Sequence, residues 1–126
     1  ESDQDTWSQK YNLVWDKVLG YNVFDSQIAL DEVAYYLTKQ NIYGLPLDCR
    51  RNWTKSDWIM WSATMSPDKA TFEEFMRPMH KFFGETTHRV PMTDWYNTDE
   101  PTHIYFQNRA VVGGYWMKML ADKLAK

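Results

Sequence analysis

Hydrophobic residues recur along this chain at three- and four-residue steps, which is the spacing of one face of an α-helix. Five segments follow this pattern, and none shows the alternation of a convincing strand. The pattern predicts an all-α chain with helices over residues 8–19, 25–40, 56–65, 66–83 and 108–125. The long connections over 41–55 and 84–107 are rich in charged and aromatic residues, and connections of that length tend to be functional.

Residues with known terminal preferences mark several of the predicted helix ends. Gly20 follows the first helix as a natural stop, and Asp25 is a favourable N-cap for the second. Ser66, with a proline directly after it, predicts the start of the fourth helix. Gly113 and Gly114 weaken the last helix unless a neighbouring backbone packs closely against them.

The composition narrows the classes of function. The 126 residues carry a formal net charge of −3 with scattered basic residues, which argues against nucleic-acid binding. No apolar run approaches the roughly 20 residues that span a bilayer, so no membrane segment is expected. Cys49 is the only cysteine and the three histidines lack metal-ligand spacing, so no metal and no cofactor are predicted. The aromatic content of 17%, with seven Trp, is high enough to suggest rings that line a site as well as a core.

The first long connection and the start of the helix after it place two carboxylates among cations. The stretch YGLPLDCRRNWTKSDW contains Asp48 and Asp57 together with Arg50 and Lys55, interleaved with Trp58 and other rings. Two carboxylates in such a setting can be driven to different pKa values, which acid–base catalysis requires. The alternative is a salt-bridged loop that covers a core, with Asp57 serving as a first-turn carboxylate.

The second long connection repeats the pairing of Asp with Trp. Asp94 and Trp95 follow Arg89, and Arg109 opens the last predicted helix. A carboxylate beside an indole suits a polar amide or ring-bearing substrate, and an Arg can grip a substrate carboxylate through two hydrogen bonds. The alternative is that Trp95 anchors the loop and Asp94 caps the following turn.

A covalent nucleophile is not evident in the sequence. Ser66 and Lys69 match a Ser-x-x-Lys pattern, but the helix start explains Ser66 and no companion motif follows. If the protein is a hydrolase, carboxylates that activate water are therefore the more economical hypothesis.

Four stretches of the chain resemble the C-terminal part of the glutaminase A family, in its six-hairpin glycosidase-like helical domain. They are WSQKYNLVWDKVLG, EVAYYLTKQNIYGLPLDCRRNWTKSDWIMWSA, THRVPMTDWY and FQNRAVVGG. The resemblance implies helical hairpins that form part of an (α/α)6 toroid, and hydrolysis of L-glutamine to L-glutamate and ammonia. It also implies an extracytoplasmic location and a longer parent protein, of which residues 1–126 form a single helical domain near the C-terminus.

The longer parent has consequences for partners and activity. We expect the chain to pack against the rest of its parent, and the isolated piece to be inactive and to self-associate through apolar edges. The loop arguments predict Asp57, Asp94 and Asp48 as catalytic residues. They predict, as substrate-binding residues, Arg50, Lys55, Trp58, Arg89, Trp95 and Arg109. The competing hypotheses are a glycoside-acting enzyme, because carboxylate pairs flanked by Trp also cleave sugars, and a non-catalytic carbohydrate-binding or structural module.

Overall fold

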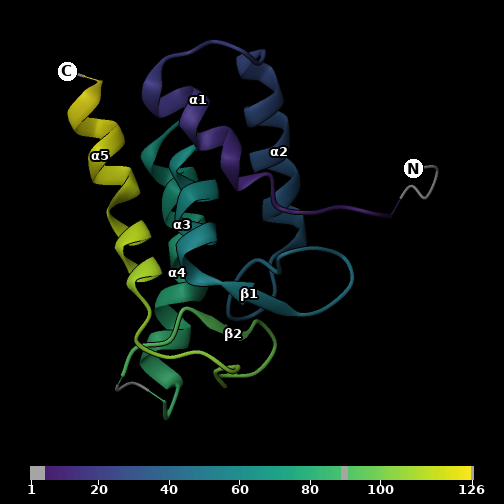
Figure 1. Ribbon diagram of the computed structural model, residues 1–126. Coiled ribbons are helices and arrows are strands. Elements are labelled where there is room, and N and C mark those ends of the chain that lie inside the picture. The colour runs from purple at the N-terminus through teal and green to yellow at the C-terminus, as the bar shows by residue number, and fades with distance from the viewer. Residues whose placement is uncertain (1–4, 89–90, 126) are drawn as a thin grey trace.

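The computed structural model describes residues 5–88 and 91–125. The chain is predominantly helical, with one small sheet (Figure 1). Its elements, in chain order, are the 3₁₀ helix η1 (Tyr11–Leu13), α1 (Val14–Leu19), α2 (Ser26–Lys39), β1 (Trp53–Lys55), α3 (Ser56–Thr64), α4 (Lys69–Glu85), β2 (Trp95–Asn97), the 3₁₀ helix η2 (Ala110–Trp116) and α5 (Met117–Leu124).

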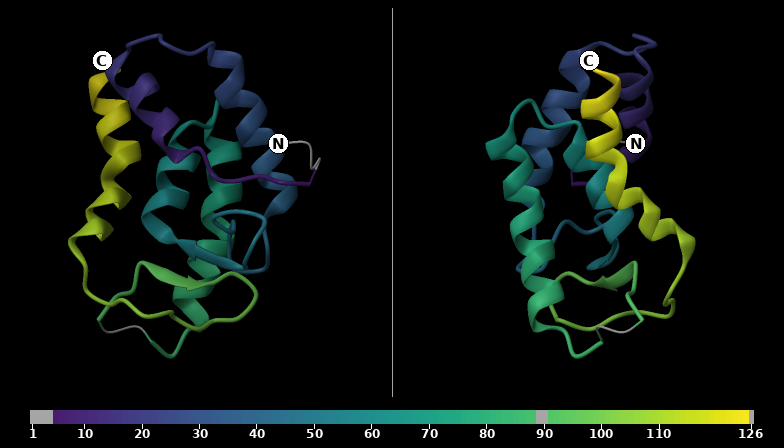
Figure 2. Two further views of the ribbon diagram at one scale, coloured as in Figure 1. Left: turned by 45° about the vertical axis from the view of Figure 1, so that its right-hand side comes forward. Right: turned by 90° about the vertical axis from the view of Figure 1, so that its left-hand side faces the viewer.

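Helix α3 is the centre of the molecule. It contacts η1, α1, β1, α4, η2 and α5, so most of the chain packs around it. The fully buried side chains of the core include Ile59 of α3 itself together with Tyr36, Phe75, Phe82 and Tyr96. The ring of Phe82 stacks on that of Tyr96 with centroids 3.8 Å apart. The views of Figure 2 agree that the sheet and the two long connections lie together at one end of the helices.

Several predicted helix ends are confirmed. Gly20 ends α1 with φ 64°, a left-handed conformation that glycine adopts without a steric penalty. The Asp25 side chain caps α2 by accepting a hydrogen bond from the backbone N–H of Gln27 at 2.9 Å. Helix α3 begins at Ser56, as the pattern predicted.

The prediction that the chain has no strand is wrong. Strands β1 and β2 come from the two long connections and pair in an antiparallel ladder, with Trp53 opposite Asn97, Thr54 opposite Tyr96 and Lys55 opposite Trp95. Each strand is only three residues long, too short for alternation to stand out from a loop. The all-α prediction therefore holds for the helices and fails for the connections between them.

Three predicted helix starts also differ from the structure. The first helix begins late, because the segment before it is extended and the Gln9 N–H donates to the Leu47 carbonyl at 2.8 Å. Asp68, not Ser66, caps α4, and it accepts from the Thr71 N–H at 2.8 Å. The last helix opens as the 3₁₀ helix η2, whose Val and Gly residues favour α-helix weakly.

The close approach predicted for the glycine pair is found at Gly114. A Cβ added there would lie 2.8 Å from Trp61 Nε1 and 2.9 Å from the Cβ of Asp57, whereas one added at Gly113 would meet nothing within 4 Å. Gly114 therefore lets η2 pack directly against α3.

Replacing Gly114 by Ala should destabilise the fold by about 1–3 kcal/mol, because the added methyl group overpacks this contact. Urea denaturation measures the loss, and Gly113→Ala is the matched control within the same helix. Equal midpoints for the two variants would contradict the contact.

Large apolar side chains remain exposed on the outer helices. On η2 and α5 they form a stripe at helical spacing, made up of Trp116, Met119, Leu120 and Leu124. Among the described residues, no helix has both the length and the apolar character that crossing a membrane requires.

Candidate functional site

The β1–β2 ladder brings the two Asp-Trp pairs of the sequence together. Asp94 directly precedes β2 and Asp57 lies just after β1, at the same end of the ladder. The Ser56 N–H donates to the Asp94 carbonyl at 2.8 Å and continues the ladder by one step. Two segments 38 residues apart in sequence are joined in this way.

Asp94 is held by Arg109 in a two-pronged ion pair. The Asp94 side chain is fully buried, and its Oδ1 accepts from Arg109 Nε at 3.1 Å while its Oδ2 accepts from Nη2. The guanidinium also lies over the ring of Phe106, 4.3 Å from its centroid. The hydrogen bonds to Asp94 raise the pKa of Arg109. Arg109 was predicted to bind substrate, and in the structure it orients a buried carboxylate.

Asp57 lies beside this ion pair, and one of its two carboxylate oxygens accepts no hydrogen bond from a described residue. Its side chain is 4% exposed, and Oδ2 lies 3.8 Å from Lys55 Nζ. Its Oδ1 is buried and has no hydrogen-bond partner among the described residues. Burial raises the pKa of Asp57, and the charge of Asp94 adds to this shift. The charge of Lys55 and the backbone N–H groups of Asp57 and Trp58 at the start of α3 oppose it. Burial therefore outweighs the helix-terminus effect that the sequence suggested for this residue.

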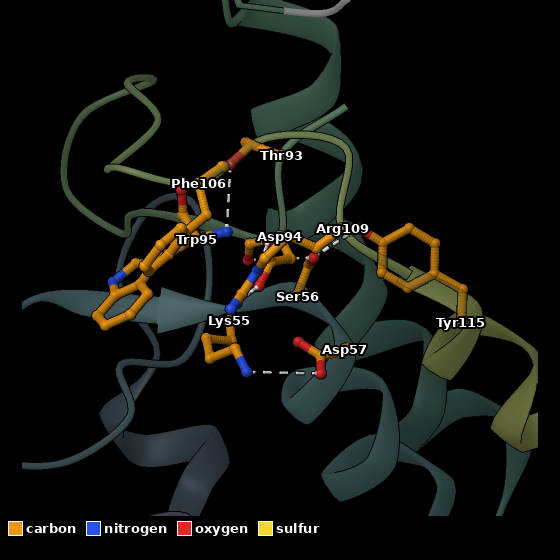
Figure 3. Close-up of polar contacts among 9 residues, drawn as sticks. All are labelled: Lys55, Ser56, Asp57, Thr93, Asp94, Trp95, Phe106, Arg109 and Tyr115. Carbon is orange, nitrogen blue, oxygen red and sulfur yellow. Dashed lines mark hydrogen bonds and ion pairs between the residues drawn. The ribbon is translucent and has the colours of Figure 1, made fainter. Parts of the chain in front are cut away.

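Sequence reasoning missed two members of this group. The Ser56 hydroxyl is hydrogen-bonded to the hydroxyl of Tyr115, which η2 places to one side of the carboxylates (Figure 3). Burial raises the pKa of Tyr115 to about 12.

The signal for Tyr115 was its place directly after Gly114, the glycine at which η2 packs against α3. We refer to Lys55, Ser56, Asp57, Asp94, Arg109 and Tyr115 as the carboxylate cluster.

The outward face of the ladder carries a second group of residues. Side chains alternate along a strand, so Thr54 and Tyr96 enter the core while Trp53 and Trp95 share the other face. Figure 3 shows the Trp95 ring extending away from Asp57. A cavity of about 380 Å³ lies at this face, lined by Leu47, Asp48, Arg50, Arg51, Trp53 and Trp95. We call it the outer pocket.

The structure divides the predicted site residues between these two places. Asp48 and Arg50 lie in the outer pocket, where Asp48 Oδ2 accepts from Arg50 Nη2 at 2.6 Å and Oδ1 accepts from the Arg50 N–H at 2.8 Å. These bonds lower the pKa of Asp48. Asp57, Asp94, Lys55 and Arg109 lie in the carboxylate cluster. The structure therefore brings two of the three predicted Asp residues together with an Arg and places Asp48 elsewhere.

Of the remaining predicted residues, Trp95 lines the outer pocket. Trp58 does not line it, and its ring packs against Tyr11 and Lys55. The Trp58 ring stacks on Tyr11 with centroids 3.9 Å apart, and Lys55 Nζ lies 4.0 Å from its centroid. Arg89 lies outside the described residues. Arg51 and Trp53 were not predicted as site residues, although they stand within the same connection.

No group of three or more His, Cys, Asp or Glu side chains is placed to hold a metal ion within residues 5–88 and 91–125.

Comparison with known proteins identifies relatives along nearly the whole chain. A family model described as the glutaminase A six helical-hairpin domain matches residues 2–119. Glutaminase A of Aspergillus oryzae is 32% identical over 107 residues, which is 82% of this chain. A probable glutaminase of Arthroderma benhamiae is 36% identical over 93 residues, or 71% of the chain.

The relatives are much longer than the chain. The matched region spans 15% of the Aspergillus protein and 11% of the Arthroderma protein. No solved structure matches the chain.

Proposed function

This chain belongs to the family of the glutaminase A six helical-hairpin domain, and from this premise we propose that it is part of an amidohydrolase that converts L-glutamine to L-glutamate and ammonia. By the whole protein we mean the longer protein of which residues 1–126 form one helical domain near the C-terminus. In that protein the helices form part of an (α/α)6 toroid, and the isolated chain is inactive.

The observation that supports the proposal is the buried carboxylate of Asp57, of which Oδ2 lies near Lys55 and Oδ1 accepts no hydrogen bond from a described residue. A general base works best when its pKa lies nearer to the working pH than that of an ordinary carboxylate, and burial moves Asp57 in that direction. Its Oδ1 lacks a partner among the described residues, so it is able to accept a hydrogen bond from water. A purely structural carboxylate would be expected to use both oxygens, as Asp94 does.

The proposed reaction begins when Asp57 accepts a proton from a water molecule whose oxygen attacks the amide carbon. The carbon–nitrogen bond then breaks, and the proton passes to the departing nitrogen as ammonia forms. Lys55 is close enough to Asp57 to stabilise the negative charge that develops on the amide oxygen. Asp94 and Arg109 act as a positioning pair, because their two hydrogen bonds fix the end of β2 against α3.

Access to Asp57 depends on η2. Gly114 lies against the Cβ of Asp57, and Tyr115 covers Ser56 beside it. Turnover therefore requires η2 to move aside. A 3₁₀ segment with two adjacent glycines suits this movement, since its hydrogen bonds are weaker than those of an α-helix.

The exposed apolar stripe on η2 and α5 supports a proposal about partners. Trp116 and Met119 are more than half exposed, and Leu120 and Leu124 continue their line. We propose that the rest of the whole protein covers this stripe, and that the isolated chain self-associates through it. We further propose that the whole protein acts outside the cytoplasm. Its small-molecule partner is glutamine, or a glycan under the alternative hypothesis.

The test is an assay of the whole protein for ammonia and glutamate released from L-glutamine, run beside an assay for reducing sugar released from glycans. Stoichiometric ammonia and glutamate without sugar release is the expected result. Sugar release without ammonia would favour the glycoside-acting alternative. Binding of glycan without turnover of either substrate would favour the non-catalytic module.

A further inference from the structure

We propose that the outer pocket binds the head group of an α-amino acid, with Arg50 and Arg51 holding its carboxylate and Asp48 holding its ammonium group. The assignment rests on the proposed function insofar as the natural ligand is glutamine. It changes the predicted role of Asp48 from catalysis to binding, and it adds Arg51 and Trp53 as site residues.

The charged groups of the pocket are available to a ligand. The Arg50 side chain is 82% exposed and pairs with Asp48 through Nη2, so its other guanidinium N–H groups remain to bind a carboxylate. Asp48 has more acceptor positions than its two bonds to Arg50 use. Arg51 lies over the Trp53 ring at 5.2 Å and makes no ion pair with any described residue. Stacking on the ring fixes the plane of a guanidinium and leaves its edge free for a planar carboxylate.

The aromatic residues enclose this charged group. Trp53 and Trp95 meet edge to face with centroids 6.1 Å apart, and Tyr105 packs edge-on against both at 6.0 Å. Tyr105 is 73% exposed and has φ 56°, a left-handed conformation that costs energy for a bulky residue. The contacts with both Trp rings hold this strained residue beside the pocket. Trp95 Nε1 itself is buried and has no acceptor among the described residues.

The same observations favour an amino acid over a neutral sugar. A sugar normally stacks on an open aromatic face, and Arg51 occupies a face of Trp53. Two guanidinium groups against one carboxylate leave the pocket with a net positive charge, which favours a ligand that carries a carboxylate. The paired opposite charges of Asp48 and the arginines complement the two charges of an amino-acid head. The volume of about 380 Å³ is within the range of small-molecule sites.

The test is isothermal titration of the whole protein with L-glutamine and L-glutamate. Two analogues each lack one charge of the head group, namely 4-carbamoylbutanoate without the ammonium and L-glutamine methyl ester without the carboxylate. Glucuronate supplies a carboxylate on a sugar, and methyl glucoside supplies a sugar alone. Both amino acids should bind, each analogue should bind roughly tenfold to a hundredfold more weakly, and the two sugars should not bind.

Variants make the assignment specific. Arg50→Gln and Asp48→Asn should each weaken glutamine binding roughly tenfold or more, and in turnover should raise KM with little change in kcat. Arg77→Gln is the matched control, because Arg77 is likewise an exposed arginine paired with a nearby carboxylate, that of Glu74 at 2.9 Å. It should change neither binding nor turnover.

The outcomes separate this proposal from the proposed function. Ammonia release with an unchanged KM in the Arg50 and Asp48 variants would overturn the pocket and leave the function standing. Glutamine binding that these variants abolish, without ammonia release from the whole protein, would support the pocket and overturn the function. Binding of glucuronate or methyl glucoside in preference to amino acids would overturn the pocket assignment.

Discussion

Replacing Asp57 by Asn should lower kcat for glutamine hydrolysis by roughly 10²–10⁴-fold in the whole protein, the usual contribution of a general base. The amide keeps the size of the side chain and removes only its ability to accept a proton. KM should change little, because Asp57 is not among the residues that line the outer pocket. Steady-state ammonia release measures both constants.

The same substitution should leave the protein at least as stable at neutral pH. The folded pKa of Asp57 lies above its ordinary value of 3.8, so the folded state binds more protons than the unfolded state between those two values. Stability therefore falls as the pH rises from the unfolded to the folded pKa, and Asp57→Asn removes this loss. Urea denaturation from pH 3 to pH 8 should show a smaller decline in the variant.

Asp68→Asn is the matched control for Asp57→Asn. Asp68 is an exposed carboxylate at the N-cap of α4, where Asn caps about as well as Asp. Its kcat should equal that of the unmodified protein. If Asp57→Asn retains full kcat, or loses activity only because it unfolds, then Asp57 is not the base.

Replacing Arg109 by Met should destabilise the protein by about 3 kcal/mol or more, the largest stability effect that we expect. Asp94 would keep its fully buried position and lose both charge-assisted hydrogen bonds. Because the Arg109 side chain is 34% exposed, water will replace part of what is lost, which places the effect at the lower end of the range for buried pairs. The shift in the urea midpoint, with the slope of the transition unchanged, measures it.

Two further variants test whether the loss of stability in Arg109→Met arises because the buried Asp94 carboxylate is left without a partner. Arg77→Met removes an exposed arginine from an exposed pair and should cost less than about 1 kcal/mol. Combining Arg109→Met with Asp94→Asn should recover part of the loss, since no buried charge is then left. A loss for Arg109→Met no greater than that for Arg77→Met would contradict the importance of the pair.

The helices were predictable because their signals are local. Asp25 at a cap and Gly20 at a stop act within one turn of their own helix, so a single sequence reveals them. Asp68 was missed because Ser66 and Pro67 offered a competing start two residues earlier. The structure uses Ser66 differently, since its N–H continues the turn at the end of α3 by donating to the Ala63 carbonyl.

The site was predictable only in part, because it depends on a ladder that the sequence did not reveal. The sequence marked Asp57 and Asp94 as separate candidates, each followed by a Trp, and the pairing of Ser56 with Asp94 brings them into one cluster. The same ladder turns Trp53 and Trp95 to its other face, with Asp48 beside them. Lys55 of the carboxylate cluster pairs directly with Trp95 of the outer pocket, so the two groups adjoin at this ladder. No local pattern in three-residue strands specifies which of their side chains face outward.

The length of the loop that the ladder closes bears on how the chain folds. Ser56 and Asp94 are separated by 38 residues, and the whole of α4 lies between them. Closing so long a loop is entropically cheaper once α4 has packed on α3, because the ordered hairpin shortens the effective distance between its ends. The helical hairpin would then assemble early and the ladder late. Both the carboxylate cluster and the outer pocket would be among the last features of the molecule to form and the first to open.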